Sequence, residues 1–342
     1  MNRSARLLCI ALLALTPIIA FTGCKKQQPP RQSRFSAGHA TAQIEVNADH
    51  ANQLPMLVAS ARRAFNSVWS GFNPTNRAGE INKINRMGSE YRLQISFDTF
   101  RGLDLADYYG RLANGAYDFT LGPLREIWGL DGAPPDEPPI EEEIAALKNI
   151  VGPDHIQLAE QGAISILTPG TQIRPGELPY AYGTDLAILD MRSRELGPAL
   201  LSWGSFTRAL SQPGDTFSAQ AALQNPFNKT NRLGSVDLAP AAALATADLY
   251  KESVTIAGIR YGGIINPLTG HPATGAVFAA VRGPTCTMSH VLAQSLIVFG
   301  LEKGREILNN FPDCEVLLIP DKQPVEIWMT PASRSTSKST RR

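Results

Sequence analysis

Hydrophobic side chains recur with helical spacing in several stretches of this chain. Apolar residues three and four positions apart line one face of 51–69, 79–86 and 97–112, and each stretch is predicted to be an amphipathic helix. Three glutamates from position 141 predict another helix start, since negative charges are favoured at helix N-termini. A further helix is expected over 186–200.

Shorter apolar runs between these helices predict strands. Residues 35–46 alternate in part and predict a first strand, while 155–158 and 163–167 predict a β pair. A final strand is expected at 315–319, and 211–235 lack a strong period and are expected to be rich in loops. Helices and strands that alternate in this way indicate an α/β or α+β fold, with mixed sheets flanked by helices.

Length and composition are those of an ordinary globular protein. The chain has 342 residues, of which 43% are hydrophobic and 18% charged, enough for one large domain or two small ones. The 32 basic and 31 acidic residues leave a net charge of +1. Such a balance gives no indication of nucleic-acid binding, so partners must be inferred from sites.

The first 23 residues have the pattern of a signal peptide. Arg3 and Arg6 precede an apolar run over 7–21 that is too short to span a membrane comfortably. Phe-Thr-Gly over 21–23 then precedes Cys24, and this four-residue sequence resembles a bacterial lipobox. Cleavage there would leave lipidated Cys24 as the mature N-terminus, anchored to a bacterial membrane and facing the periplasm or the cell exterior. An uncleaved signal anchor is the alternative.

Three segments follow the signal peptide. Residues 24–34 are polar and contain two prolines, so they are predicted to form a flexible tether. Residues 35–331 form the folded domain, and the Ser-, Thr- and Arg-rich tail over 332–342 is predicted to be disordered.

Two cysteines, Cys286 and Cys314, belong to the predicted domain. An oxidising compartment permits a disulfide between them, but both lie in apolar surroundings and are equally compatible with simple burial. No Cys-x-x-Cys pair is present, so the sequence supports neither a redox motif nor a zinc site.

A loop rich in turn-forming residues follows the helix predicted over 97–112. Gly115 and Gly122 flank Asp118 and Thr120, and Trp128 with another glycine closes the stretch. The glycines let backbone N–H groups approach a phosphate or ribose, and the two polar side chains can hydrogen-bond to it. The same residues suit a turn with a capped helix, in which Thr120 or Asp118 satisfies backbone donors, and the spacing alone favours this interpretation.

This stretch resembles the G-(A)-F-D-x-T-x-G-P-L…W-G signature of the ApbE-type FAD:protein FMN transferases. A second stretch, Arg-Tyr-Gly-Gly-Ile-Ile-Asn-Pro-Leu-Thr-Gly over 260–270, resembles R-Y-x-H-I-(I/L)-D-P-x-T-G of the same family. The resemblance implies a nucleotide site between two halves of the fold. It also implies a reaction that splits FAD and attaches FMN to an acceptor threonine of an extracytoplasmic flavoprotein, with Mg²⁺.

The resemblance also implies which residues lie near the flavin nucleotide. Gly263 and Asn266 occupy the positions of a family histidine and aspartate, so no catalytic residue is assigned. The residues expected to contact the nucleotide are Ala116, Tyr117, Asp118, Thr120, Thr246, Ile264, Asn266 and Thr269.

Metal-binding positions are substituted as well. The family ligates Mg²⁺ through an aspartate and a threonine four residues apart, which share a helix face. His290 and Gln294 stand at these positions, and Pro179 stands where a backbone carbonyl approaches the metal. A neutral imidazole in place of a carboxylate is expected to weaken Mg²⁺ binding, and a plain helix N-terminus is the alternative interpretation.

Three functions are therefore compatible with the sequence. The first is a flavin transferase with altered ligands. The second is a flavin-binding or partner-binding lipoprotein of the same fold without catalysis, and the substitutions favour it on physical grounds. The third is a tethered structural lipoprotein that binds no nucleotide.

Overall fold

The computed structural model describes residues 29–160, 162–211, 219–228 and 230–330. The predicted signal peptide, lipidated Cys24 and C-terminal tail lie outside these described residues. Within them, no helix combines the length and apolar character that crossing a membrane requires.

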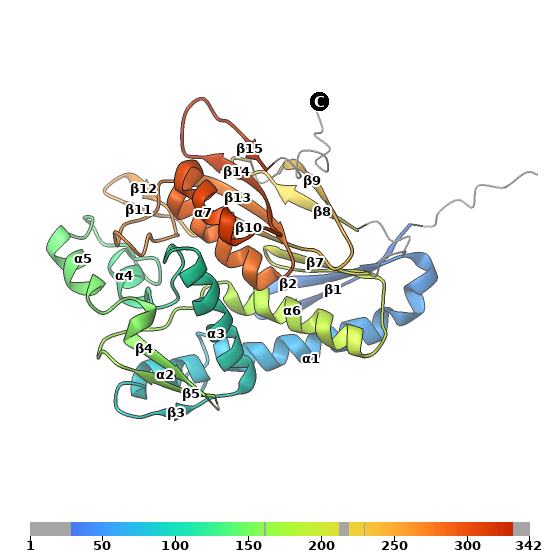
Figure 1. Ribbon diagram of the computed structural model, residues 1–342, viewed down its shortest axis with the longest axis horizontal. Helices are drawn as coiled ribbons and strands as arrows, with labels where there is room; N and C mark the ends of the chain where they lie inside the picture. Colours follow the sequence, from blue (N-terminus) through green and yellow to red (C-terminus); the bar gives the residue numbers. More distant parts are fainter. Residues whose placement is uncertain (1–28, 161, 212–218, 229, 331–342) are drawn as a thin grey trace, which may run out of the picture.

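An eight-stranded sheet forms the body of the molecule (Figure 1), and every pairing between its neighbouring strands is antiparallel. The strands in spatial order are β1 (Arg31–Ala37), β2 (Ala40–Val46), β6 (Ala199–Trp203), β7 (Phe206–Leu210), β10 (Ala243–Asp248), β13 (Ala276–Gly283), β14 (Glu315–Pro320) and β15 (Trp328–Met329). The α+β class is thus confirmed, with antiparallel rather than mixed sheets.

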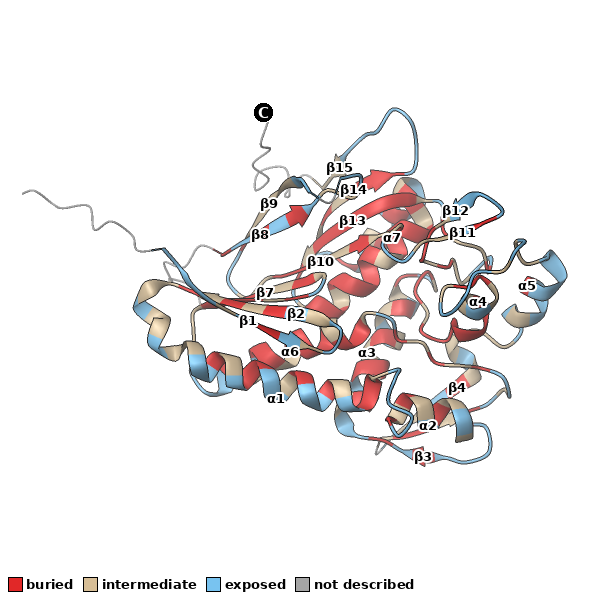
Figure 2. Ribbon diagram, turned by 180° about the vertical axis from the view of Figure 1, so that it is seen from behind, coloured by how far each residue is buried: buried red, intermediate tan, exposed pale blue. Residues whose placement is uncertain are grey.

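Helices cover one face of this sheet. These are α1 (Leu54–Phe72), α6 (Leu178–Ser193) and α7 (Cys286–Ile307), with α3 (Phe97–Leu112) packed against all three. Figure 2 shows α7 buried along much of its length. The rings of Phe65 and Trp203 stack at 3.7 Å between centroids, so α1 and the sheet share one apolar core.

The opposite face of the sheet is covered by a hairpin of β8 (Ala219–Gln224) and β9 (Arg232–Leu238). Below the helices in Figure 1, a small sheet forms from β3 (Leu93–Gln94), β5 (Ala163–Ile166) and β4 (Ile156–Ala159), beside α2 (Glu80–Met87). The remaining elements are α4 (Gly122–Ile127), α5 (Glu141–Lys148), β11 (Val254–Ile256), β12 (Ile259–Tyr261) and the 3₁₀ turns Ala48–Gln53, Pro153–His155 and Leu308–Asn310.

The N-terminal strand prediction needs correction. Residues 35–46 were expected to form one strand, but β1 and β2 form a hairpin whose turn lies at Gly38 and His39. Gly38 has φ +58°, a backbone conformation that glycine adopts without strain. β1 starts at Arg31, so the last four residues of the predicted tether over 24–34 are part of the sheet.

Two further predictions differ from the structure. The helix expected over 186–200 belongs to α6, which starts at Leu178 and ends at Ser193, because the chain turns out of the helix at Glu195, whose φ is +55°. The segment 211–235, expected to be loop-rich, contains β8 and the start of β9. The strand expected last, β14, is followed by β15.

Candidate active site

The loop between α3 and α4 is fixed by its own side chains. Asp118 Oδ1 accepts hydrogen bonds from the backbone N–H and the hydroxyl of Thr120, both at 2.7 Å. Thr120 Oγ1 accepts one from the N–H of Gly152, also at 2.7 Å, and Thr120 is fully buried. The threonine therefore supports the loop, whereas Asp118 also borders cavities, and burial raises the pKa of its carboxyl.

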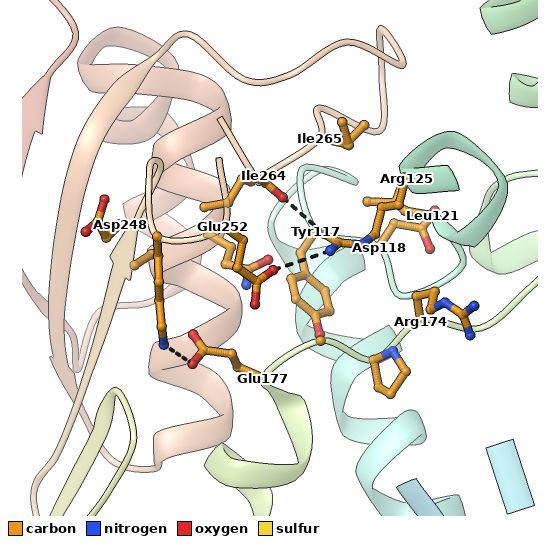
Figure 3. Close-up of a pocket in the computed structure, with 16 residues that line it drawn as sticks. Tyr117, Asp118, Leu121, Arg125, Arg174, Glu177, Asp248, Glu252, Ile264 and Ile265 are labelled. Atoms are coloured by element: carbon orange, nitrogen blue, oxygen red, sulfur yellow. Dashed lines mark hydrogen bonds and ion pairs between the residues drawn. The ribbon is translucent and has the colours of Figure 1, made fainter. Parts of the chain in front are cut away.

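Two adjoining cavities, of about 80 Å³ and about 560 Å³, lie where this loop meets the start of α6 and the turn after β10. Both are lined by Arg125, Arg174, Pro175, Gly176, Glu177, Lys251 and Glu252. Tyr117, Asp118, Gly263, Ile264 and Gln294 help to enclose the smaller one (Figure 3). A third cavity, of about 350 Å³, shares Tyr117 and Asp118 and continues along α3.

Two ion pairs at the smaller cavity start from adjacent residues, Lys251 and Glu252, in the turn after β10. Lys251 pairs with the carboxylate of Glu177 and donates a hydrogen bond to Ser205 Oγ at 3.0 Å. The adjacent Glu252 accepts a hydrogen bond from Arg125 Nη2 at 3.3 Å. Figure 3 draws both pairs as dashed lines. Lys251 and Glu252 thus connect this turn to the start of α6 and to α4.

The Arg125 guanidinium is held from two sides. Asp131 Oδ1 accepts from Arg125 Nε at 3.0 Å and from Nη2 at 2.9 Å, and the Gly263 carbonyl accepts from Nη1 at 3.0 Å. The other oxygen of Asp131 accepts from Arg174 Nε at 3.1 Å. One carboxylate therefore fixes two guanidinium groups at the boundary between the two cavities.

An aromatic wall bounds the larger cavity. The rings of Trp69 and Tyr180 lie 5.3 Å apart between centroids, and that of His39 lies 5.2 Å from Trp69. The backbone N–H of His39 donates to the Tyr180 hydroxyl at 3.2 Å. This wall offers the larger cavity a flat aromatic surface.

The residues expected to contact the nucleotide are only partly brought together. Tyr117, Asp118 and Ile264 line the smaller cavity, whereas Ala116 is buried in the core. The Thr246 hydroxyl faces the backbone oxygen of Ser205 at 3.5 Å.

Asn266 and Thr269 stabilise their own turn. Asn266 Oδ1 accepts from the N–H of Leu268 at 2.9 Å, and Thr269 Oγ1 accepts from that of His271 at 3.3 Å. Neither residue lines any of the three cavities.

The metal positions do not suit Mg²⁺. His290 is 1% exposed, lies between the rings of Tyr117 and Phe206, and leaves its Nε2 without a hydrogen-bond partner. Burial, with the positive charge of Lys251 as a second cause, lowers the pKa of His290 to about 3. Gln294 lines the smaller cavity and Pro179 the larger one.

We looked for an alternative metal site in the part of the chain that the structure describes. Among the described residues, no group of three or more His, Cys, Asp or Glu is arranged to hold a metal ion. The donor set around His290 therefore lacks the carboxylates that Mg²⁺ prefers.

The two cysteines resolve the alternative that the sequence left open. Cys286 and Cys314 are both buried and both free. Cys314 Sγ lies 3.7 Å from the sulfur of Met288. Burial raises the pKa of both thiols, so neither is an activated nucleophile.

Sequence reasoning missed Arg125, Lys251 and Glu252 as residues of the site. Arg125 belongs to the loop that the sequence singled out, but its partner Glu252 lies 127 residues further on. Lys251 and Glu252, adjacent and opposite in charge, have the pattern of a solvated surface turn. The only available signal was that they follow directly on the segment containing Thr246.

The fold and the site define an α+β protein with a polar, internally ion-paired cavity suited to a charged small molecule. The chain belongs to the ApbE family, whose family model matches residues 39–318. The resemblance found in the motifs is thereby confirmed over most of the chain.

Curated relatives and solved structures agree with this assignment. The FAD:protein FMN transferase of Vibrio cholerae serotype O1 is 25% identical over 303 residues, which cover 86% of this chain and 89% of the relative. That of Escherichia coli K12 is 25% identical over 233 residues, or 66% of each chain.

Two solved structures share the fold. The ApbE protein of Thermotoga maritima superposes with a TM-score of 0.79 at 19% identity and covers 91% of this chain and 100% of its own. The flavin transferase ApbE of V. cholerae superposes with a TM-score of 0.75 at 22% identity, and the match covers 90% of this chain and 100% of that structure.

Proposed function

We propose that this protein binds FAD and transfers its FMN moiety to a threonine of a flavoprotein partner. The observation that carries the proposal is that three segments which resemble family motifs converge on one cavity, through Asp118, Ile264 and Gln294. Several relatives are named FAD:protein FMN transferase, which supports the same reaction. The adjoining aromatic wall suits a flat isoalloxazine ring.

In the proposed reaction the acceptor threonine hydroxyl attacks the phosphorus on the FMN side of the FAD diphosphate. A new O–P bond joins FMN to the threonine, the bond from that phosphorus to the bridging oxygen breaks, and AMP leaves. The hydroxyl proton must go to a base. Asp118 suits this role because it borders the cavity and burial raises the pKa of its carboxyl, which makes the carboxylate a stronger base.

Mg²⁺ enters this proposal only as an expectation from the family. The buried, neutral His290 and the amide of Gln294 do not form the carboxylate-rich set that the ion prefers. No step of the proposed reaction is therefore assigned to a metal.

The proposed location is the outer face of a bacterial membrane. It rests on the signal-peptide pattern and on Cys24 as the lipidation site, with the acceptor flavoprotein in the same compartment. The chain between Cys24 and β1 would then serve as a short spacer between the lipid and the folded domain.

A second candidate is FAD binding without transfer. It is favoured by the side chains at two family positions, since Gly263 has no ionisable group and Asn266 stabilises its own turn. Removal of one hydrogen-bond donor that stabilises a transition state typically slows a reaction by about 10²–10³-fold, so transfer requires other residues to compensate.

The test separates these two functions. Full-length protein in detergent is titrated with FAD by flavin fluorescence, then incubated with FAD and a threonine-containing flavoprotein acceptor from the same compartment. Covalent flavin on the acceptor, lost when its threonine is replaced by alanine, would establish transfer. Binding without transfer selects the second candidate, and no binding at high micromolar FAD would refute both.

A further inference from the structure

We propose that the Lys251 ammonium and the Arg125 guanidinium form a built-in cation site for the ligand's diphosphate, in place of a bound metal ion. The inference rests on the proposed function, because it assigns the diphosphate of FAD to these two side chains. It differs from the family's expected metal-dependent binding, for which this chain lacks suitable ligands.

The first support is the geometry of the turn after β10. Lys251 and Glu252 extend from adjacent positions and reach Glu177 at the start of α6 and Arg125 in α4 (Figure 3). Both cations line both cavities. A diphosphate that spans the boundary between the cavities would therefore meet the Lys251 ammonium and the Arg125 guanidinium, with the Arg174 guanidinium also bordering both cavities.

The second support is that the present partners of these cations are replaceable. The side chains of Lys251 and Glu252 are 43% and 57% exposed, against 21% for Glu177 and 17% for Arg125, so each ion pair is open to solvent on one side. A diphosphate offers several charged oxygens that can form bidentate hydrogen bonds with a guanidinium. An entering diphosphate can displace Glu252 from Arg125 and Glu177 from Lys251.

The third support is that the other charges of the cavity are already engaged. Asp131 remains as a second anchor for Arg125 once Glu252 has been displaced. Asp248 accepts a hydrogen bond from the N–H of Tyr250, and Asp118 accepts two from Thr120. Neither carboxylate forms an ion pair with the two cations.

The fourth support explains why the family histidine is a glycine in this chain. A Cβ at Gly263 would lie 2.7 Å from the backbone oxygen of Glu252 and 2.8 Å from its Cβ. Only glycine leaves room for this turn, and the turn carries Lys251. In this chain the glycine at position 263 and the position of Lys251 therefore depend on each other.

The experiment measures ligand binding by calorimetry with full-length protein in detergent, in EDTA and then in Mg²⁺. The probes are FAD, ADP as a diphosphate without flavin, and riboflavin as a flavin without phosphate. The variants are Lys251→Met, which removes the charge, and Lys251→Arg, which retains it. Lys83→Met on the exposed surface of α2 is the matched control.

We expect wild-type affinity for FAD and ADP to change less than about threefold between EDTA and Mg²⁺. Lys251→Met should weaken FAD and ADP at least about tenfold, as the loss of a hydrogen bond to a charged group does. Lys251→Arg and Lys83→Met should stay close to wild type, and riboflavin should bind all four proteins alike. Glu177→Gln should tighten ADP, since it removes the competing carboxylate.

The outcomes distinguish this inference from the proposed function. FAD binding that requires Mg²⁺ and is unchanged in Lys251→Met would overturn the cation site and leave the flavin function standing. ADP binding without FAD binding would support the cation site and refute the flavin function. Failure of both ligands to bind the wild-type protein would refute both.

Discussion

Asp185 accepts a hydrogen bond from Arg208 Nη1 at 2.5 Å, and the two side chains are only 8% and 7% exposed. The same carboxylate accepts hydrogen bonds from the backbone N–H groups of Cys286 at 2.8 Å and Thr287 at 2.9 Å. One buried side chain of α6 therefore joins β7 to the N-terminus of α7, where a negative charge is favoured. Because α7 carries His290 and Gln294, this junction positions one wall of the site.

Replacement of Asp185 by alanine should destabilise the protein strongly. It leaves the Arg208 charge buried without its partner and two helix N–H groups without acceptors, and removal of one member of a buried pair costs about 3–5 kcal/mol. The free energy of unfolding in urea, followed by circular dichroism, measures the loss. Asp104→Ala, which removes an exposed pair with Arg101, is the control and should cost less than about 1 kcal/mol. Equal losses in the two variants would contradict the role of the buried pair.

Stability should fall in mild acid because of His290. Its folded-state pKa is lowered to about 3, whereas an unfolded histidine titrates near about 6.5. Between these values the unfolded chain binds a proton that the folded protein does not, so stability is present above about pH 6.5 and is lost as the pH falls. The contribution approaches about 1.4 kcal/mol per pH unit.

The His290 contribution is measured as the difference between urea unfolding curves of wild type and His290→Gln from pH 7 to pH 4. Because an uncharged amide does not titrate, the difference between the two proteins should be constant above about pH 6.5, and below it the glutamine variant should lose less stability per pH unit than wild type. If the free energy of unfolding of the two proteins falls in parallel with pH, His290 is protonated as readily in the folded protein as in the unfolded chain, and its pKa is not lowered by folding.

Much of the fold could be predicted because, in several segments, the spacing of apolar residues and the capping residues indicate the same element. The helix over 97–112 was found with both bounds correct, since its apolar period agrees with a serine cap at Ser96 that accepts from the N–H of Thr99. The hairpin at Gly38 was missed because the alternation of apolar residues continues past its turn, where the glycine has φ +58°. The end of α6 was missed because the chain leaves the helix at Glu195, whose φ of +55° is not indicated by the residue type.

The site could be predicted only as far as its motifs reach. The motifs predicted the loop of Asp118 and the segment of Ile264 that follows β12, because these segments have distinctive turn chemistry. The ion pairs that fill the cavity join Lys251 to Glu177 across 74 positions of the chain. Such a pairing depends on how α6 packs against the sheet, and no local pattern in one sequence contains that information.

Asp118→Asn should separate binding from transfer. If the carboxylate accepts the proton of the threonine hydroxyl, its loss should lower the transfer rate by about 10²–10⁴-fold while FAD affinity stays within about threefold. The two are measured by single-turnover labelling of the acceptor and by FAD fluorescence. Asp136→Asn, an exposed carboxylate outside the cavities, is the control. An unchanged transfer rate in Asp118→Asn would exclude this residue as the base.

Restoration of the family histidine by Gly263→His should damage the protein rather than activate it. The new Cβ would lie within 2.8 Å of two atoms of Glu252, and such overpacking typically costs about 1–3 kcal/mol. Displacement of that turn moves Lys251 as well, so affinity for FAD in EDTA should fall. Gly132→His is the control, because a Cβ there meets nothing within 4 Å. A Gly263→His protein that keeps wild-type stability, and whose FAD affinity now rises with Mg²⁺, would show that the turn after β10 adapts to the histidine and that the metal site needs only this one side chain.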